Sequence, residues 1–342
     1  MERGGRITLA HGAGGQEMHQ LLKQLVFSRV KLKSLKGGIG LEAADDSALL
    51  PIMGEHVVFT IDSYTVNPIF FPGGDIGKLA MTGTINDIAV MGARPLAIMD
   101  AIVVEEGFPL SDLNRIMDSM VKVSEEVGVP LVGGDFKVMP KGAVDRIVIT
   151  TAGVGILIGE KPITDSGLKP GDRIIVSGTI GEHGATIMAL QSGIEVEPGT
   201  LSSDCAPVIR IMEIAMEIGG VHAAKDPTRG GLAMALNEMA RKSSVMIVLN
   251  EEDIPIREEV RAYCEMLGVD PLVLASEGRV VMGVDGNKAE EILDVLRAEG
   301  YKEASIIGEV RKGKAGYVLM KTVVGGHRLV EPPLGEIVPR IC

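Results

Sequence analysis

The hydrophobic and polar positions of the chain are most regular between residues 72 and 95. A Pro-Gly-Gly turn opens this segment. From Ile76, apolar or small residues then recur at i, i+3, i+4 and i+7, which predicts an amphipathic helix. Gly92 is placed to end that helix. Asn86 and Asp87 interrupt its apolar run. A buried carboxylate is unfavourable unless it is paired or binds a metal, so Asp87 is either a candidate ligand or a residue that faces solvent.

Strand and helix patterns continue on both sides of this segment. We expect strands at residues 57–61, 96–104, 129–132, 146–158, 173–176, 271–274, 279–284, 305–310 and 317–321. We expect helices at residues 16–27, 111–127, 207–218 and 287–298, and two more that end near residues 191 and 242. These patterns predict an α/β (α+β) protein. A linker with Pro and Gly at residues 161–172 divides them, so we expect domains at residues 1–158 and 159–328 and a tail at residues 329–342.

The length and charge of the chain narrow its possible functions. Its 342 residues suffice for about two domains. Its formal net charge of −12 disfavours nucleic acid and anionic membranes as partners. The polar start of the chain argues against a signal peptide, and no uncharged apolar run is long enough to cross a membrane. The three cysteines form no CxxC pattern and cannot all pair, which is typical of a reducing cytoplasm.

Carboxylates recur where predicted strands and loops end. Asp45 and Asp46 close a predicted loop, Asp62 and Asp135 follow predicted strands, and Asp87 lies in the apolar helix. A carboxylate at a strand end contributes little to a core and is well suited to bind a ligand. Hard oxygen ligands suit Mg²⁺, which usually also contacts substrate phosphates. The pattern therefore predicts a magnesium-phosphate site in the first half of the chain.

Two glycine-containing segments are candidates for phosphate binding. In HGAGG, residues 11–15, the glycines would let backbone N–H groups approach an anion. Glu17 stands where a GxGxxG motif needs its third glycine, and no Walker A motif is present. KDPTRGG, residues 225–231, precedes a predicted helix and combines cations with glycines. Asp226 could equally be the N-cap of that helix, with Pro227 as its first residue.

The tail runs EPPLGEIVPRIC and ends on a nucleophile, Cys342. Its prolines keep it extended, without internal hydrogen bonds. A frayed terminus is the simplest interpretation, but the last residues are largely apolar. Cys205 and Cys264 instead lie in apolar helical patterns, where cysteine usually behaves as a small buried hydrophobe. We expect the α-carboxylate to raise the pKa of the Cys342 thiol and Arg340 to offset this in part.

Seven segments together carry a resemblance. They are HGAGG, DDSA, FFPGGDIGKLAMTGTINDIAVMGARP, GTIGEHG, KDPTRGGLA, SEG and the terminal PRIC. With them, nearly the whole chain resembles the HypE family of hydrogenase maturation factors, within the wider superfamily of aminoimidazole ribonucleotide synthetase and selenophosphate synthetase. KDPTRGGLA is shared across that superfamily, whereas PRIC points to the HypE family. Phe136 stands where the family is expected to have a small polar residue, which leaves Asp135 and Lys137 in place.

The resemblance implies a fold and a reaction. The fold is two α/β domains like those of aminoimidazole ribonucleotide synthetase. The first domain pairs with that of a second copy to form a β-barrel, and ATP lies at the homodimer interface. In the reaction, a carbamoyltransferase partner, HypF, places a carbamoyl group on the thiol of Cys342. The enzyme then uses ATP and Mg²⁺ to dehydrate this group to a thiocyanate, the source of cyanide for the iron of nickel–iron hydrogenase, which a HypC–HypD complex carries.

The positions of the polar residues, together with this reaction, lead us to expect roles for individual residues. ATP and its metal would be bound by Asp45, Asp46, Asp62, Lys78, Asn86, Asp87, Asp135 and Asp226. The metal itself would be bound by Asp45, Asp62, Asp87, Asp135 and Asp226. Cys342 would carry the reacting group. Either Glu277 or His11 would remove protons from its nitrogen, while Lys137 would stabilise the developing charge. The sequence does not rank the two candidate bases.

Two other functions fit parts of the sequence. The first is another ATP-using enzyme of the superfamily, either a small-molecule kinase or a selenophosphate synthetase. A selenophosphate synthetase would carry a reactive Cys or selenocysteine in its N-terminal glycine-rich segment, and residues 11–15 hold none. The second is a non-enzymatic carrier that hands a metal or ligand from Cys342 to a partner. A carrier needs no nucleotide site, so a measurement of ATP hydrolysis separates it from the enzyme.

Overall fold

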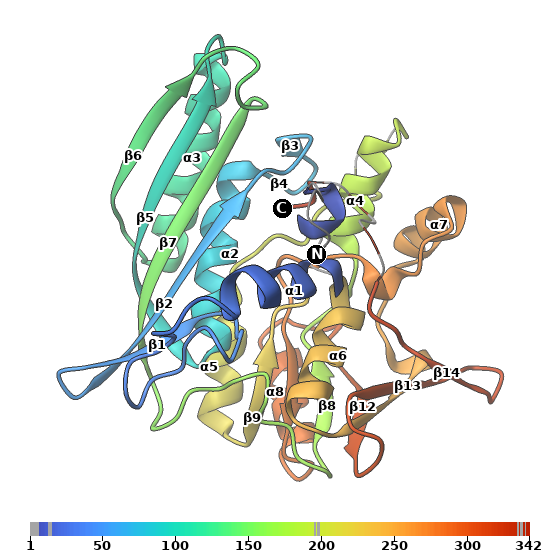
Figure 1. Cartoon of the computed structure of the whole chain (residues 1–342). Helices are drawn as coiled ribbons and strands as arrows, with labels where there is room; N and C mark the ends of the chain where they lie inside the picture. The colour runs from blue at the N-terminus through green and yellow to red at the C-terminus, as the bar shows by residue number, and fades with distance from the viewer. Residues whose placement is uncertain are drawn as a thin grey trace.

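The structure is a computed structural model that describes residues 7–12, 16–194, 196, 199–333, 335, 338 and 340–342. A five-stranded sheet lies in the first half of the chain and a seven-stranded sheet in the second (Figure 1). A separate β-ribbon pairs β3 (Phe70–Phe71) with β4 (Gly74–Asp75). No helix in the described part of the chain is both long enough and apolar enough to span a membrane.

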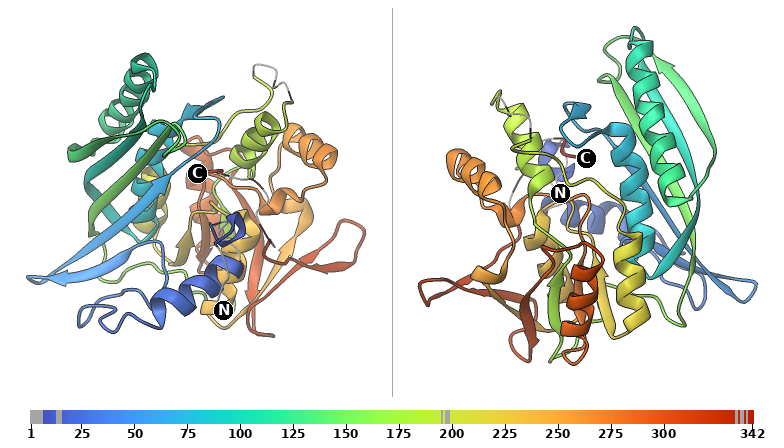
Figure 2. Two further views of the ribbon diagram at one scale, coloured as in Figure 1. Left: turned by 45° about the horizontal axis from the view of Figure 1, so that its top comes forward. Right: turned by 180° about the vertical axis from the view of Figure 1, so that it is seen from behind.

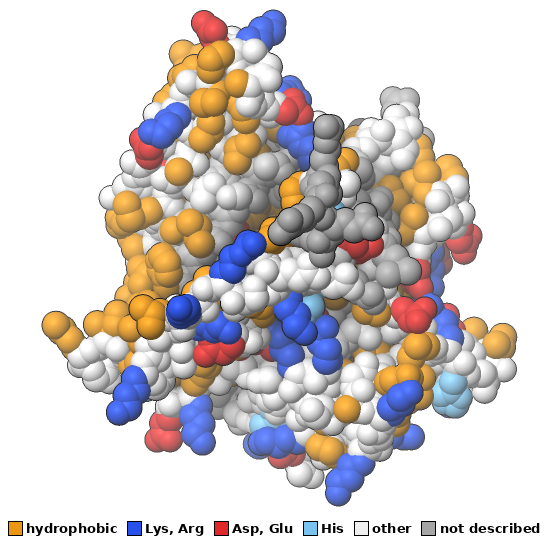
Figure 3. Space-filling model, viewed as in Figure 1, with side chains coloured by type: hydrophobic (Ala, Val, Ile, Leu, Met, Phe, Trp, Pro, Cys, Tyr) orange, Lys and Arg blue, Asp and Glu red, His pale blue; other side chains and the backbone are white. Residues whose placement is uncertain are grey.

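The first sheet has the strand order β1, β2, β7, β5, β6. Its strands are β1 (Ala48–Ile52), β2 (Glu55–Tyr64), β5 (Ala93–Glu105), β6 (Leu131–Met139) and β7 (Ile147–Leu157). Helices α2 (Ile76–Val90) and α3 (Leu110–Val127) cover one face. The other face carries exposed hydrophobic side chains, among them Phe59, Ile61 and Met99. Figure 3 shows hydrophobic side chains gathered over this sheet, along one side of the molecule.

Helix α2 is buried on every side. Of its residues, only Lys78 is not buried, so the prediction of an amphipathic helix was wrong. The first sheet covers one side of α2, and α3 together with the second half of the chain covers the rest, which explains why its sequence is apolar all round. Asp75 caps the helix by accepting from the N–H groups of Gly77 at 2.8 Å and Lys78 at 3.0 Å.

The second sheet has the order β14, β13, β10, β12, β8, β11, β9. Its strands are β8 (Arg173–Val176), β9 (Val221–Lys225), β10 (Met246–Asn250), β11 (Val281–Val284), β12 (Ser305–Arg311), β13 (Tyr317–Lys321) and β14 (His327–Leu329). The helices of this half are α4 (Glu182–Gln191), α5 (Ile209–Ile218), α6 (Gly231–Lys242), α7 (Glu258–Leu267) and α8 (Ala289–Ala298). Near the N-terminus, α1 (Gln16–Leu22) continues into a wider turn at Lys23–Phe27.

The two halves share one hydrophobic core. It joins side chains of α2 and α3, such as Ile85 and Ile116, to side chains of the second half, such as Ile187 and Leu274. Both the described start of the chain and its last residue lie between the halves, and the C-terminus sits between α2 and α4 in all three ribbon views (Figures 1 and 2). The first and the last described residues therefore lie close together between the two halves.

Several predicted boundaries were wrong in ways that bear on the site. Strand β2 extends beyond residue 61, so Asp62 lies inside the strand. Strand β6 begins where the predicted strand 129–132 was expected to end, so Asp135 lies in mid-strand. Helix α6 is capped by Gly230, and Asp226 is not its N-cap. Residues predicted as a strand at 271–274 form a 3₁₀ turn, Pro271–Val273.

The close packing of α2 gives a test of this fold. A Cβ atom on Gly83 would lie 2.2 Å from the Tyr64 hydroxyl oxygen, inside the core. Alanine favours an isolated helix over glycine by about 1 kcal/mol, but this overlap works against it. We expect Gly83→Ala to lower the free energy of unfolding by ~1–3 kcal/mol in urea denaturation. Gly159→Ala is the control, because the nearest atom to its Cβ is 3.9 Å away. Equal stability of both variants would contradict this packing.

Candidate active site

Two adjoining cavities lie between the halves of the chain. The first, here named the carboxylate cavity, has a volume of about 530 Å³ and is lined by acidic side chains together with Lys225 and Arg229. Its acids include Asp45, Asp46, Asp62, Asp87 and Asp226. The second, the tail cavity, has a volume of about 340 Å³, and the last three residues of the chain, Arg340 to Cys342, form part of its lining. Arg229 lines both cavities, so one cation connects them.

The carboxylate cavity brings acids from four separate elements together. Asp46 precedes β1, Asp62 comes from β2, Asp87 from α2, and Asp226 follows β9. Burial raises the pKa of Asp87 well above its usual value, and the charges of Asp62 and Asp226 raise it further. Burial and the charge of Asp46 raise the pKa of Asp226 to about 7. These shifts show that the acids are close enough to repel one another.

Two lysines neutralise one side of this acidic group. Lys225 forms an ion pair with Asp46, and Lys242 lies 2.6 Å from Asp165 and 3.2 Å from Asp45. Asp62 and Asp87 have no ion pair within the described residues. The hydroxyl of Thr60 donates to Asp87 at 2.9 Å. The cavity therefore keeps a surplus of negative charge on the side of β2 and α2.

This donor set suits a hard cation by its chemistry. Carboxylate oxygens are the protein ligands that Mg²⁺ prefers, and a cation would relieve the repulsion that raises the pKa of Asp87. In the described part of the chain, no group of three or more His, Cys, Asp or Glu side chains is arranged to hold a metal ion as it stands. Part of the reason is that Asp46 and Asp45 turn towards Lys225 and Lys242.

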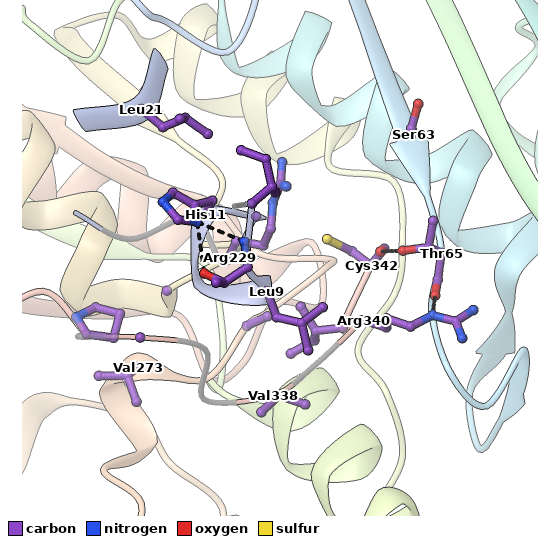
Figure 4. A pocket seen from close by; sticks show the side chains of 18 residues that line it. Leu9, His11, Leu21, Ser63, Thr65, Arg229, Val273, Val338, Arg340 and Cys342 are labelled. Carbon is purple, nitrogen blue, oxygen red and sulfur yellow. Dashed lines mark hydrogen bonds between the residues drawn. The ribbon is translucent and has the colours of Figure 1, made fainter. Parts of the chain in front are cut away.

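The last residues of the chain are docked in the tail cavity and are not frayed. Thr65 donates to a terminal oxygen of Cys342 from its N–H at 3.1 Å and from its hydroxyl at 3.2 Å. Arg340 donates to the carbonyl of Thr65 at 2.7 Å and pairs with Asp145. Figure 4 shows the Cys342 sulfur pointing away from Thr65, towards the side of the cavity that carries Arg229.

The thiol of Cys342 is held neutral by its surroundings. Burial raises its pKa to about 12, and the Arg229 guanidinium opposes this shift only in part. The prediction that Arg340 would be the compensating cation was wrong, because Arg340 points to Thr65 and Asp145. The Cys205 and Cys264 thiols are buried, as expected. Burial also raises the pKa of Cys205 to about 12 and that of Cys264 to about 11.

Of the two candidate bases, Glu277 is the one held inside the protein. Its side chain is 2% exposed, and its Oε1 atom has no hydrogen-bond partner among the described residues. Burial and the charges of Asp226 and Asp204 raise its pKa well above its usual value, while Arg229 opposes this. His11 also lines the tail cavity, but its ring is partly exposed and lies 2.8 Å from the Thr8 hydroxyl.

Three other predicted site residues lie outside this group. Asp135 and Lys137 form an exposed ion pair at 3.0 Å on edge strand β6. Strand pairing aligns Asp135 with Ala101, which puts Asp135 on the sheet face opposite to Asp62. Strands β2 and β6, which carry Asp62 and Asp135, are three strand spacings apart, or roughly 14 Å. Lys78 donates to Gly73 at 2.9 Å, and the helical rise puts it about 13 Å along α2 from Asp87.

Asn86, a predicted cofactor residue, makes structural hydrogen bonds in this structure. Its amide nitrogen donates to the carbonyls of Ala206 at 3.1 Å and Glu277 at 3.3 Å, and its oxygen accepts from Val208 at 2.9 Å. These bonds use the polar atoms of its side chain to join α2 to the second half. In the predicted HGAGG phosphate loop, Ala13, Gly14 and Gly15 lie outside the described residues.

Sequence reasoning missed several residues that shape the site. Thr65 and Asp165 have no motif that marks them, because their partners are distant in sequence. His183 belongs to GTIGEHG, which was noticed only as part of the resemblance. Arg229 was noticed as a phosphate ligand but not as the neighbour of Cys342. Its position in KDPTRGG, three residues after Asp226, was the available signal.

Comparisons with known proteins identify the family. Residues 44–157 match the family described as AIR synthase related protein, N-terminal domain, and residues 169–321 match its C-terminal domain. The carbamoyl dehydratase HypE of Azotobacter vinelandii is 42% identical over 341 residues, which cover 99% of this chain and 98% of that protein. The chain belongs to the HypE family. A hydrogenase expression/formation protein of Methanocaldococcus jannaschii is 48% identical over 339 residues, 98% of this chain and 100% of that protein.

Solved HypE structures agree with this assignment. HypE in complex with ATP has a TM-score of 0.81 and 39% identity, and covers 98% of this chain and 100% of that chain. A HypE–HypF complex matches with a TM-score of 0.84 and 39% identity, and covers 93% of this chain and 100% of that chain. The two-domain fold expected from the sequence is therefore confirmed as that of the HypE family.

The acidic group gives a prediction for stability against pH. The pKa values of Asp226 and Asp165 are about 7 in the folded chain, above the usual value of 3.8. The folded protein therefore binds more protons than the unfolded chain between pH ~4 and 7, so its stability falls as pH rises through this range. We expect a lower melting temperature at pH 8 than at pH 5.5 for the protein without ligand.

Two variants locate the source of this pH effect. Asp226→Asn removes one of the titrating groups and should flatten the dependence of the melting temperature on pH. Asp118→Asn is the matched control, because Asp118 is exposed on α3, away from the cavity, and the variant should keep the full dependence. A melting temperature that rises from pH 5.5 to pH 8 would contradict the raised pKa values.

Proposed function

We propose that this chain is an ATP-dependent carbamoyl dehydratase of nickel–iron hydrogenase maturation. It acts on an S-carbamoyl group carried by its own Cys342 and converts it to a thiocyanate, which supplies cyanide for the hydrogenase iron. The observation that carries the proposal is the position of the Cys342 thiol, docked beside Arg229 and close to Glu277, next to a cavity lined by acids. Relatives named carbamoyl dehydratase and a relative solved with ATP support it.

The position of Cys342 fits the chemistry of dehydration. An amide oxygen is a poor leaving group, and transfer of the γ-phosphoryl group of ATP to it makes it a good one. The C–O bond then breaks, phosphate leaves, and the nitrogen loses its two protons as the C≡N bond forms. Such a reaction depends on positioning and on neutralisation of charge more than on covalent help from the enzyme. Arg229 lines both cavities and would stabilise charge on the transferred phosphoryl group.

Glu277 is our candidate for the base that accepts a proton from nitrogen. The raised pKa of its carboxyl makes its ionised form a strong base, and Arg229 favours that form. Its free Oε1 atom leaves one oxygen available for the N–H group. His11 is the weaker candidate, because its ring is more exposed and bonds to Thr8. This ranks the two bases that the sequence left open.

Asp46, Asp62, Asp87 and Asp226 are our candidates for holding Mg²⁺ with the nucleotide. Bound there, Mg²⁺ would neutralise phosphate oxygens. Asp46 would take part only after leaving Lys225, and Asp45 only after leaving Lys242. Asp135 and Lys137 would reach such a site from a second copy, if the homodimer forms through the exposed face of the first sheet. We also propose HypF and a HypC–HypD complex as partners, the domain division at residues 158 and 159, and a cytoplasmic location.

The chemical test follows the mass of the C-terminal peptide. After carbamoylation, we expect ATP and Mg²⁺ to lower the mass of that peptide by one water in mass spectrometry. Cys342→Ala should abolish the carbamoylated peptide, because it removes the acceptor sulfur. Cys205→Ala and Cys264→Ala are the controls and should keep the mass change, because both thiols are buried in the core. A carbamoylated peptide that ATP leaves unchanged would rule out the dehydratase and favour the carrier.

The acidic group can be tested through ATP turnover. Asp87→Asn keeps the size of the side chain and removes the charge that would attract the metal. We expect at least ~10-fold slower ATP turnover, equivalent to about 1.4 kcal/mol, with an unchanged circular dichroism spectrum. Asp118→Asn, on the exposed surface of α3, should turn over ATP at the normal rate. Normal turnover in Asp87→Asn would exclude Asp87 as a ligand.

A further inference from the structure

The docked end of the chain is bound mainly through its backbone. Thr65 donates from its N–H to a terminal oxygen of Cys342 at 3.1 Å, and Asn67 donates from its N–H to the carbonyl of Arg340 at 3.1 Å. These two donors are two residues apart, and so are the two carbonyls that accept from them, so the backbone of the tail is held at two points. The carbonyl of Ile341, the residue between Arg340 and Cys342, points away from Thr65 and Asn67. Its oxygen lies 2.7 Å from the Nε2 atom of His183.

The hydrogen bonds around His183 fix its protonation. The carbonyl of Ile341 can only accept, so Nε2 of His183 must carry the hydrogen. In a neutral imidazole Nδ1 then accepts, and the hydroxyl of Ser203, 2.7 Å away, donates to it. The Ser203 oxygen in turn accepts from the N–H of Cys205 at 3.1 Å. Each donor in this series of hydrogen bonds has an acceptor, and only the Nε2–H tautomer of His183 allows all of the bonds to form.

His183 is also held rigidly. Its side chain is fully buried, and its ring packs edge-on against Phe71 with a centroid distance of 5.4 Å. Burial lowers its pKa to about 4, so it remains neutral at physiological pH. It lies in the first turn of α4, in the second half of the chain, whereas Thr65 follows β2 in the first half. The tail therefore accepts hydrogen bonds from both halves of the chain.

We propose that His183, as its neutral Nε2–H tautomer fixed by Ser203, is a positioning residue for the reaction at Cys342. This inference rests on the proposed dehydratase function. With the carbonyl of Ile341 and the end of Cys342 both bound, the only freedom left to the thiol is its staggered side-chain rotamers. The sulfur then stays beside Arg229, where its carbamoyl group would react. A displacement of about 1 Å at a reacting group can cost about 100-fold in rate.

A pair of substitutions separates this role from simple core packing. In His183→Gln the amide nitrogen can take the place of Nε2 and still donate to Ile341. In His183→Asn the shorter amide can reach the Ser203 side but not the tail. Both variants lose the ring, so a purely structural role would affect them alike, whereas the proposed role predicts that only His183→Asn frees the tail.

Tail docking can be measured without ATP or any carbamoyl group. Iodoacetamide reacts with thiolates, so the docked and neutral Cys342 should react slowly in the native full-length chain. We expect His183→Asn to speed alkylation of Cys342 by ~10-fold or more, as for a lost hydrogen bond of about 1.4 kcal/mol to the tail. His183→Gln should stay within ~3-fold of the original protein. Peptide mass spectrometry measures the extent of alkylation of Cys342 and of the buried Cys205 in the same sample, so Cys205 reports any opening of the core.

The reaction supplies a second measurement. With the carbamoylated chain, His183→Asn should slow the loss of water in a single turnover while leaving the KM for ATP unchanged, and His183→Gln should restore the rate. The inference is overturned if both variants alkylate Cys342 at the original rate, or if both free it equally. If His183→Asn also exposes Cys205, the core has opened, and Ser203→Ala takes its place. We then expect a smaller rise at Cys342, because the carbonyl of Ile341 still favours the Nε2–H tautomer, and no rise at all overturns the inference. A failure of the original protein to lose water would refute the dehydratase but leave the alkylation result standing.

Discussion

The negative charge buried between the two halves is the constraint on which the rest of the structure depends. Asp87 reaches this place only because α2 is apolar on every side and can be enclosed by both halves. Burying several carboxylates together is unfavourable, as the raised pKa values of Asp87 and Asp226 show. Lys225 and Lys242 offset the charge on one side only, which leaves the β2 side suited to a bound cation.

The same burial accounts for the state of the tail. Apolar surroundings keep the thiol of Cys342 neutral, and Arg229 lowers its pKa too little to ionise it. The guanidinium of Arg229 borders both cavities, so it can respond to charge on either side. Glu277 lies under the same influences, with a carboxyl that burial disfavours as an anion and Arg229 favours. The charges of these three groups are thus balanced against one another at the boundary of the two cavities.

Local signals in the sequence were sufficient for much of the fold but not for the site. Strands 173–176 and 317–321 were predicted with the bounds of β8 and β13, because each is a short apolar run between turns. Asp226 had two interpretations, and only the three-dimensional structure gave the N-cap position to Gly230. The strand pairing of β6 puts Asp135 on the face opposite to Asp62, and no local pattern encodes that pairing. The contacts of Thr65 and His183 with the tail join residues more than 150 positions apart, so spacing could not reveal them.

The docked position of Cys342 also separates two chemical steps. A thiol attacks a carbamoyl donor as its thiolate, and a pKa of about 12 makes the thiolate rare while the tail is docked. Under the proposed function, the docked position therefore disfavours carbamoylation, whereas dehydration of a carbamoyl group needs no ionised sulfur and can proceed with the tail in place. The described contacts allow both states, because the few hydrogen bonds from Thr65, Asn67 and His183 to the tail contribute on the order of 1 kcal/mol each. A tail bound much more tightly could not be loaded, and one without these bonds would not hold its carbamoyl group beside Arg229.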